Sequence, residues 1–303
     1  MCGIVGAAST QNVVDLLIEG IRKLEYRGYD STGIAIVRDG RLERLRSTGR
    51  VAHLADLAKK KHVEAGTGLS HTRWATHGAP TEANAHPHFS SGDGLDIGIV
   101  HNGIVENHEP IRARMKAQGY EFASETDTEV MVHHVHSLAA KGATLFEAVK
   151  RASREWEGAY AVGFVSSREP GVVVGARKGS PLLVGLGKGE NFLASDASAL
   201  IARTREVIYL EEGDVAEIRT DGVTVCDRSG KRVERAVTTS KLSADAVELG
   251  PYAHYMQKEI FEQPGAVANT LEMVANARAL QPALFGVGAD KIFSNIKYIQ
   301  ILA

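Results

Sequence analysis

The sequence contains very little cysteine. Cys2 and Cys226 are its only two cysteines in 303 residues, which excludes both a disulfide framework and a zinc site built from four cysteines. So low a cysteine content is typical of proteins from a reducing compartment. We therefore expect the protein to be cytoplasmic.

The sequence also lacks an excess of charge and long apolar runs. The 35 Lys and Arg residues nearly balance the 37 Asp and Glu residues, for a formal net charge of -2. This balance excludes a general basic surface that would bind nucleic acid or a membrane. No run of about 18 apolar residues occurs, so no transmembrane helix is predicted. Residues 1–6 have neither the basic region nor the long apolar region of a signal peptide.

Proline is scarce, with 8 residues, whereas glycine is abundant, with 31. Many glycines indicate tight turns and close backbone contacts in a β-rich protein. Asp39 and Gly40 lie between two short apolar stretches and predict a hairpin. Apolar spacing in the first half predicts strands over 3–7, 33–37, 42–46, 69–74 and 97–101, and helices over about 12–25, 127–140 and 144–157.

After the last of these helices the pattern changes to strands alone. They are predicted over 160–165, 171–176, 182–186, 207–210, 214–219 and 223–226. Strands in blocks, with helices in pairs, disfavour a doubly wound parallel sheet. We therefore expect an α+β fold in which two packed sheets are covered by helices.

The composition changes again near residue 240. Residues 238–243 are polar and indicate a linker, and residues 254–277 are expected to be helical with an interruption at Pro264. Residues 278–288 have no regular pattern, and the apolar residues 296–303 predict a strand. A second, separate unit is therefore expected to begin at this point.

Cys2 follows the initiator methionine, and a small residue at that position permits removal of Met1. The new N-terminal residue would carry both a thiol and an α-amine, with reference pKa values of about 8.5 and about 7.7–8.0. Because these values are close, the amine can accept the thiol proton near neutral pH. One residue can thus supply a nucleophile and its general base. The alternative is that Cys2 is only a small apolar residue at the start of a strand.

Three groups of polar residues lie at the ends of predicted elements. Residues 71–78 and residues 101–103 each close a strand, and residues 124–129 open a helix that Thr126 or Asp127 could cap. Each group by itself has a simpler interpretation, namely a surface ion pair, a turn and a helix cap. Only their combination favours a functional site.

Seven short strings, in this order, resemble the class II glutamine amidotransferases, which are N-terminal-nucleophile hydrolases. They cover residues 2–6, 26–31, 71–78, 84–87, 101–104, 106–107 and 124–129. The resemblance implies a four-layer αββα sandwich over residues 1–240. It also implies hydrolysis of the side-chain amide of L-glutamine to glutamate and ammonia, without a cofactor.

Within this class, residues 71–78 are most similar to the glutamine–fructose-6-phosphate aminotransferase family, which makes glucosamine 6-phosphate. Residues 254–260 and 262–264 resemble the start of that family's sugar-isomerase half, and residues 299–303 resemble its first strand. Residues 241–303 would then be a linker and the incomplete start of an α/β sugar-isomerase domain. Fructose 6-phosphate would be used only through the missing remainder of that half, and the full-length family is homo-oligomeric.

The resemblance assigns the chemistry to three residues. Cys2 is expected to attack the amide carbon of glutamine, while its α-amine carries the proton to the leaving ammonia. The side-chain amide of Asn102 and the main-chain N–H of Gly103 are expected to bind the tetrahedral oxyanion. Loss of one such donor typically lowers turnover by about 10²–10³.

Four further residues are assigned to the substrate by the same resemblance. Arg73 would bind the α-carboxylate of glutamine, which a guanidinium can hold with two hydrogen bonds. Asp127 would bind the α-ammonium group. Thr76 and His77 are expected to be additional contacts.

Three residues are expected around this site. Trp74 would close over it and gate the path of ammonia, although a core aromatic is the alternative for this side chain. Arg27 is expected near Cys2, where a structural role is as plausible as a catalytic one. His86 is expected to support the site.

Other motifs have ordinary interpretations. The histidines within 86–88 and within 133–136 lack cysteine or carboxylate partners at metal-site spacing, so solvated or core histidines are expected and no metal site is predicted. Residues 185–189 are rich in glycine but lack a following helix, which favours a turn between strands over a phosphate loop. Cys226 is expected to be buried in a strand.

Two alternatives to an active glutaminase stay open at this point. The chain could be a non-catalytic or regulatory fragment, because most of the isomerase half is missing, and retained Met1 would favour this alternative. It could also be the glutaminase domain of another class II amidotransferase, such as one that uses phosphoribosylpyrophosphate.

Overall fold

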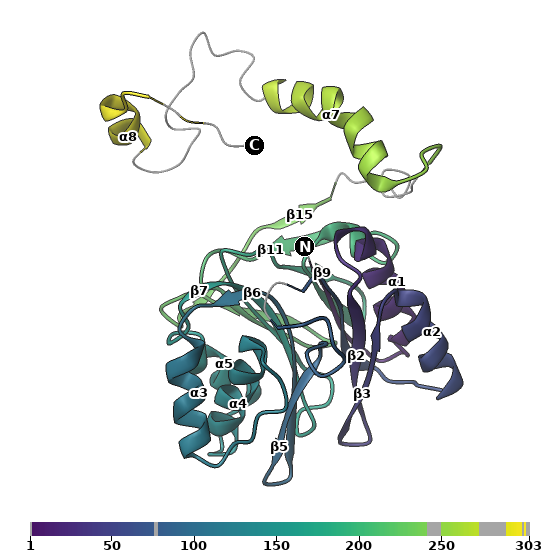
Figure 1. Cartoon of the computed structure of the whole chain (residues 1–303), viewed down its shortest axis with the longest axis vertical. Coiled ribbons are helices and arrows are strands. Elements are labelled where there is room, and N and C mark those ends of the chain that lie inside the picture. Colours follow the sequence, from purple (N-terminus) through teal and green to yellow (C-terminus); the bar gives the residue numbers. More distant parts are fainter. Residues whose placement is uncertain (1, 76–77, 241–249, 273–288, 299, 301–303) are drawn as a thin grey trace. The chain divides into compact units, whose positions relative to one another are not determined.

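Two antiparallel β-sheets form the centre of the larger part of the protein in a computed structural model (Figure 1). The structure describes residues 2–75, 78–240, 250–272, 289–298 and 300. The chain divides into two compact units, one up to Val247 and one from Glu248 onward. The sheets and the helices that cover them all belong to the first unit.

Each sheet has a fixed strand order. The first sheet contains, in spatial order, β15 (Val237–Thr239), β11 (Glu206–Tyr209), β9 (Leu183–Leu186), β10 (Glu190–Ala194), β1 (Gly3–Ser9), β4 (Thr67–Arg73), β2 (Ser31–Arg38) and β3 (Arg41–Thr48). The second contains β14 (Arg232–Val233), β13 (Val223–Cys226), β12 (Val215–Ile218), β8 (Val173–Lys178), β7 (Gly158–Ser166), β6 (Leu95–Val105) and β5 (His88–Gly92). β1 and β4 are therefore central strands of the first sheet, and β6 lies near one end of the second.

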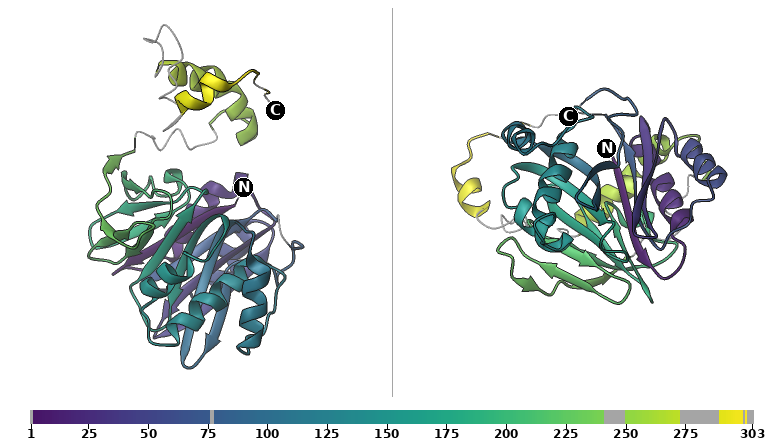
Figure 2. Two further views of the ribbon diagram at one scale, coloured as in Figure 1. Left: turned by 90° about the vertical axis from the view of Figure 1, so that its left-hand side faces the viewer. Right: turned by 90° about the horizontal axis from the view of Figure 1, so that it is seen from below.

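Helices cover the outer face of each sheet, so the unit has four layers (Figures 1 and 2). On the first sheet lie α1 (Val14–Leu24) and α2 (Val51–Lys60), with the short 3-10 helices η1 (Glu25–Arg27) and η2 (Ala197–Ala199). On the second sheet lie α3 (His108–Ala117), α4 (Asp127–Ala139) and α5 (Leu145–Ala152). This arrangement confirms the expected α+β fold with an αββα sandwich.

The sequence of β1 explains how one strand serves two cores. Ile4 and Ala8 belong to the core between the two sheets, whereas Val5 and Ala7 belong to the core between the first sheet and its helices. Successive side chains of a strand point to opposite faces, so a strand between two cores must be apolar on both. All seven residues of β1 are buried. The residue just before this strand, Cys2, is thereby attached to a central, fully buried strand of the sheet.

The two predicted turns are confirmed. β2 and β3 pair along their whole length, and both residues between them have positive φ, 51° for Asp39 and 69° for Gly40. A two-residue turn of this kind matches the twist of paired strands. The glycine-rich residues 185–189 span the end of β9 and the turn into β10. Cys226 is buried in β13, as expected.

Several ends differ from the prediction by one or two residues, and two elements, α5 and β6, end four or five residues from the predicted position. α5 ends at Ala152, not near residue 157, and Trp156 lies beyond it. Trp156 is still buried, because its ring packs against Tyr160 and Phe164 of β7. β6 does not close at His101 but continues to Val105, because its residues up to that point pair with β7.

The prediction missed several elements of the first unit, of which α2, α3, β5 and β10 are the longest. α2 carries a regular apolar stripe of Val51, Leu54, Ala55 and Ala58, all of them buried. This stripe follows the helical period and could have been detected. α3 is mostly polar and has no such stripe, so its position depends on its packing against α4.

The second unit contains α7 (Tyr255–Glu272) and α8 (Ala289–Asn295) among its described residues. The predicted interruption at Pro264 is wrong, because α7 continues through it. None of the three hydrophobic clusters contains a described residue from this unit. Among the described helices of the chain, none is long and apolar enough to cross a membrane.

The other predictions near the C-terminus have mixed outcomes. Thr238 and Thr239 belong to β15 and not to a linker. The described residues 296–298 and 300 lie outside any strand, so this part of the predicted terminal strand is wrong. The remaining residues of that strand and of the linker, and the predicted irregular segment 278–288, lie outside the described residues.

Candidate active site

Cys2 lies where β1 begins, beside the end of β4. Gly3 pairs with Thr72, so the register brings Cys2 next to the residues that follow β4. The main-chain N–H of Trp74 donates a hydrogen bond to Cys2 Sγ at 3.1 Å, and the thiol lies 3.4 Å from the Trp74 carbonyl oxygen. The nucleophile candidate is thus held by backbone groups of a residue distant in sequence.

The environment of this thiol acts on its pKa in opposite directions. Burial raises the pKa of Cys2, because a thiolate loses its hydration in a buried place. The hydrogen bond with Trp74 and the positive charge of Arg73 favour the thiolate and partly offset this effect. The negative charge of Asp30 adds to the increase.

Arg73, the last residue of β4, is buried, with 3% of its surface exposed. Its guanidinium donates hydrogen bonds of 3.3 Å to the carbonyl oxygens of Gly78 and Ala79. Burial lowers its pKa, while Cys2, Asp30 and Asp127 act in the opposite direction. Arg73 therefore provides a positive charge next to Cys2.

Asp127 is the first residue of α4, and it is also buried. Its Oδ2 accepts a hydrogen bond of 2.8 Å from the main-chain N–H of Val105, at the end of β6. The same oxygen lies 3.8 Å from Nδ1 of His101. The N-cap of α4 is Thr126, whose side chain accepts a hydrogen bond from the N–H of Glu129. The carboxylate of Asp127 consequently stays available to the site.

Asn102 and Gly103 lie inside β6, opposite the thiol. The side-chain Nδ2 of Asn102 donates a hydrogen bond of 3.1 Å to the Cys2 carbonyl oxygen. Gly103 has φ of 124°, and a Cβ at this position would lie 2.1 Å from the Ala159 carbonyl oxygen. Only glycine fits there, because both the conformation and the neighbouring backbone exclude a side chain.

All of these residues except Asn102 line one small cavity. It has a volume of about 30 Å³ and is lined by Cys2, Arg73, Trp74, His86, His101, Gly103, Thr126, Asp127 and Thr128. Such a space has room for roughly one or two water molecules. The walls come from five segments: the start of β1, the end of β4, the segment before β5, β6 and the start of α4.

The remaining residues predicted for the site are Trp74, His86, Arg27, Thr76 and His77. The ring of Trp74 is 48% exposed and makes an edge contact with Tyr29, so the alternative of a core aromatic is wrong. His86 is buried, and its Nε2 lies 2.9 Å from the hydroxyl of Thr128. Arg27 is the last residue of η1, and its side chain lies outside the part of the chain that the structure describes. Thr76 and His77 lie outside the described residues.

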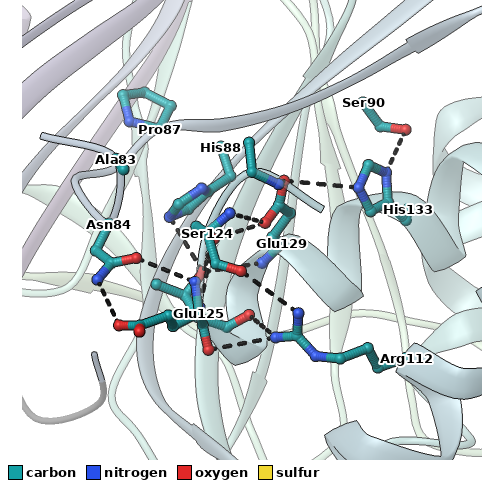
Figure 3. A network of polar contacts seen from close by, with 12 residues as sticks. Ala83, Asn84, Pro87, His88, Ser90, Arg112, Ser124, Glu125, Glu129 and His133 are labelled. Atoms are coloured by element: carbon teal, nitrogen blue, oxygen red, sulfur yellow. Dashed lines mark hydrogen bonds and ion pairs between the residues drawn. The ribbon is translucent and has the colours of Figure 1, made fainter. Parts of the chain in front are cut away.

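A buried network holds the start of α4, and with it Asp127 (Figure 3). The Glu129 carboxylate accepts hydrogen bonds from the main-chain N–H groups of Ala123 and Ser124 and from the Ser124 hydroxyl, at 2.7–2.8 Å. Arg112 donates to the carbonyl oxygens of Glu125 and Thr126. The segment that precedes α4 is therefore fixed by side chains that the sequence did not single out.

The carboxylate in this network has an unusual pKa. Burial alone would raise the pKa of Glu129, but the nearby His133 and the hydrogen bonds from Ala123 and Ser124 lower it to about 2. Glu129 is therefore ionised in the folded protein at neutral pH.

The histidines of α4 are core residues, one of the two interpretations proposed for them. His133 binds the Ser90 hydroxyl, His134 accepts from Trp156, and His136 lies 3.2 Å from the Leu95 carbonyl oxygen. Among the described residues, no three His, Cys, Asp or Glu side chains are arranged to hold a metal ion.

No role was predicted for several residues that contact the site, among them His101 and Thr128, which line the cavity, and Asp30 and His71. Asp30 accepts a hydrogen bond of 2.8 Å from the N–H of Ala75 and so holds the segment that carries Trp74. His71 contacts Asn102 from β4. Both residues lie inside the strings that carry the resemblance, but no local pattern identifies their partners.

Comparison with known proteins places this geometry in context. Residues 39–229 match the family model for the glutamine amidotransferase domain. The chain is 52% identical over 306 residues to glutamine–fructose-6-phosphate aminotransferase (isomerizing) of Bordetella pertussis and 51% identical over 304 residues to that of Escherichia coli (strain K12). Each match covers 100% of this chain and 49% of the relative. The chain thus spans about half the length of these curated relatives.

The fold has relatives among solved structures as well. It is similar to glutamine phosphoribosylpyrophosphate (PRPP) amidotransferase from B. subtilis, with a TM-score of 0.66 and 22% sequence identity. That match covers 76% of this chain and 50% of the other. At this identity the similarity concerns the fold, and it agrees with the four-layer arrangement of the first unit.

Proposed function

Because the chain belongs to the glutamine amidotransferase domain family, we propose that it hydrolyses the side-chain amide of L-glutamine to glutamate and ammonia. The observation that carries this proposal is the convergence on one cavity of a thiol, an amide donor, a buried cation and a buried carboxylate. They are Cys2, Gly103, Arg73 and Asp127, and the side-chain amide of Asn102 lies beside them and donates to the Cys2 carbonyl oxygen. A purely structural role would not require a buried arginine and a buried aspartate beside a cysteine thiol.

The reaction begins with Cys2. Removal of Met1 frees the α-amine of Cys2, which takes the proton of the thiol. The thiolate attacks the amide carbon of glutamine, a C–S bond forms, and the carbonyl π electrons move to the oxygen. Asn102 Nδ2 and the Gly103 N–H stabilise this oxyanion.

The second half of the reaction releases the products. When the oxyanion collapses, the C–N bond breaks, and the leaving nitrogen takes a proton from the α-ammonium of Cys2. The resulting thioester is attacked by water, whose proton the α-amine accepts. The C–S bond then breaks, and glutamate leaves with a carboxylate while Cys2 regains its thiol.

The other residues fix the substrate. Arg73 binds the α-carboxylate of glutamine and Asp127 its α-ammonium group, and Thr76 and His77 add contacts. Arg27 and His86 have supporting roles at this site.

We further propose that the ammonia serves the synthesis of glucosamine 6-phosphate from fructose 6-phosphate. This proposal rests on the two curated relatives. Each of them matches the whole of this chain over 49% of its own length. Residues 1–240 are then the glutaminase domain, and residues 241–303 are a linker and the first part of a sugar-isomerase domain. Trp74 would gate the passage of ammonia between the two halves.

The cellular setting belongs to the same proposal. Neither Cys2 nor Cys226 forms a disulfide, which suits a cytoplasmic protein.

The direct test is release of glutamate from glutamine. The full chain is prepared, loss of Met1 is verified by intact mass, and glutamate is measured together with the Cys2→Ala variant. Glutamate release that disappears in the variant supports the proposal. A processed chain that folds but releases no glutamate contradicts it and favours a non-catalytic role.

A further inference from the structure

His71 joins the two sheets at the candidate active site. It lies on β4 of the first sheet, with no exposed surface, whereas Asn102 lies on β6 of the second. The Nε2 of His71 is 3.0 Å from Asn102 Oδ1 and 3.0 Å from the His101 carbonyl oxygen. One imidazole nitrogen thus faces two oxygen atoms of the neighbouring sheet.

These contacts determine the tautomer of the imidazole. The His101 carbonyl oxygen can only accept a hydrogen bond, so His71 Nε2 must carry the proton. The opposite nitrogen, Nδ1, has no hydrogen-bond partner among the described residues. Rotation of the ring would lose both bonds. Burial lowers the pKa of His71 to about 3, so the ring is neutral at pH 7.

The tautomer in turn determines how the Asn102 amide is oriented. A carboxamide can be turned by 180°, which exchanges its oxygen and its NH₂ group. In the turned orientation, the NH₂ group would face the N–H of His71, and two donors would oppose each other. In the observed orientation Oδ1 accepts from His71, and Nδ2 donates to the Cys2 carbonyl oxygen at 3.1 Å. The donor therefore always points toward Cys2.

A second histidine keeps the imidazole of His71 in place. The rings of His71 and His86 lie 4.4 Å apart and are inclined by 35°. His86 itself is held through its Nε2 by the Thr128 hydroxyl, which also lies 2.9 Å from His101 Nδ1. The position of His71 is thus fixed by packing as well as by hydrogen bonds.

We propose that His71 is a positioning residue for glutamine hydrolysis, which holds the Asn102 carboxamide with its NH₂ group toward the oxyanion. This inference rests on the proposed function, because the oxyanion forms only if glutamine is attacked at Cys2. His71 itself touches neither the thiol nor the substrate. Its effect on catalysis should therefore be transmitted through Asn102 alone.

The experiment compares three substitutions of the full chain. His71→Leu removes the donor, His71→Gln keeps an N–H group near the position of Nε2, and His136→Leu changes another buried histidine that contacts a backbone carbonyl. We expect kcat of His71→Leu to fall about 10–100-fold with little change in KM, because the loss cannot exceed that of the oxyanion donor itself. His71→Gln should recover most of this loss, and His136→Leu should change kcat little.

Two further measurements separate positioning from general damage. Alkylation of Cys2 by iodoacetamide needs the thiolate but forms no oxyanion, so its rate should stay within about threefold in His71→Leu. In an Asn102→Ala background, His71→Leu should cause no further loss of kcat, as expected for two residues that act as one unit. A full additional loss in that background, or a parallel loss of alkylation, overturns the proposal.

Failure of this inference can be told apart from failure of the proposed function. An inactive wild-type chain with Met1 removed would reject the function, whereas an active chain with unchanged kcat in His71→Leu would reject only the role of His71. Nitrogen NMR of the labelled imidazole gives a result without any activity. A neutral ring with its proton on Nε2 is expected, and a proton on Nδ1 would refute the inference in either case.

Discussion

The main-chain N–H of Trp74 donates a hydrogen bond of 3.1 Å to the Sγ of Cys2, a residue 72 positions earlier in the sequence. The pairing of β1 with β4 brings these two groups together. The hydrogen bond favours the thiolate, whereas burial of the sulfur disfavours it and raises the thiol pKa. The reactivity of Cys2 therefore measures the balance between the two effects.

We predict that Cys2 in a chain that keeps Met1 has an apparent pKa above the reference value of about 8.5. Burial is the main cause, because it destabilises the charged form. Removal of Met1 places a charged amine on the same residue, which should lower this pKa. The rate of iodoacetamide alkylation against pH, measured for both forms and corrected with Cys2→Ala, checks the prediction. An apparent pKa that does not differ between the forms would contradict it.

A second prediction concerns Gly103. An alanine there would place its Cβ 2.1 Å from the Ala159 carbonyl oxygen, at a φ of 124°. We expect Gly103→Ala to lower the free energy of unfolding by about 2–5 kcal/mol, from backbone strain and overpacking together, and to abolish glutamine hydrolysis. The matched control is Gly119→Ala, where φ is 90° but no atom lies within 4 Å of the new Cβ. It should lose only about 1–2 kcal/mol. Chemical denaturation measures both, and equal losses would argue against the steric explanation.

A third prediction concerns recognition of the substrate. Asp127→Asn keeps an oxygen that can accept from the Val105 N–H, but it removes the charge that we assign to the α-ammonium group of glutamine. We expect kcat/KM for glutamine to fall about 30–3,000-fold, which corresponds to about 2–5 kcal/mol for loss of one partner of a buried charge pair. With an amide substrate that has no α-ammonium group, wild type and variant should differ much less. An equal loss for both substrates would assign Asp127 a structural role.

How far the sequence predicts the fold depends on whether a pattern is local. The turn at Asp39 and Gly40 was predictable, because two residues with positive φ suffice to form it. The sequence of Asn102 and Gly103 is also typical of a turn, yet both residues continue β6. Their pairing with Ala161 and Tyr160 of β7 decides the outcome, and that pairing involves residues nearly 60 positions away.

The same distinction applies to the site. Cys2, Arg73, Asn102 and Asp127 were singled out because each carries a recognisable chemical group in a string that resembles a known class. Their convergence on one site could not be predicted from spacing, since it depends on how the two sheets and α4 meet. His71 had no signal of its own, because its function depends on a contact between strands of different sheets. Side chains that act through another residue are the ones that a sequence pattern does not reveal.

The last prediction concerns acid denaturation of the first unit. Burial lowers the pKa of His71 and that of His88 to about 3 in the folded protein, whereas an unfolded histidine has a pKa of about 6.5. Between these values only the unfolded chain binds the protons. The contribution of these histidines to the free energy of unfolding is therefore fully present above about pH 6.5. As the pH decreases below that value, the free energy of unfolding falls by up to about 1.4 kcal/mol per pH unit for each of them.

Glu129 adds to this loss in a lower range of pH. Its pKa is lowered to about 2 in the folded protein, compared with about 4.3 in an unfolded chain, so its contribution is present above about pH 4.3 and is lost as the pH falls toward 2. We expect Glu129→Gln to be less stable than wild type at neutral pH, because the N–H groups of Ala123 and Ser124 lose a charged acceptor. The difference in the free energy of unfolding between the two proteins should be constant from neutral pH to about pH 5 and should shrink below it.

Chemical denaturation followed by fluorescence at a series of pH values tests this prediction. The control is Glu147→Gln, which changes a half-exposed glutamate on α5. A difference that stays constant down to pH 3 would mean that folding does not lower the pKa of Glu129.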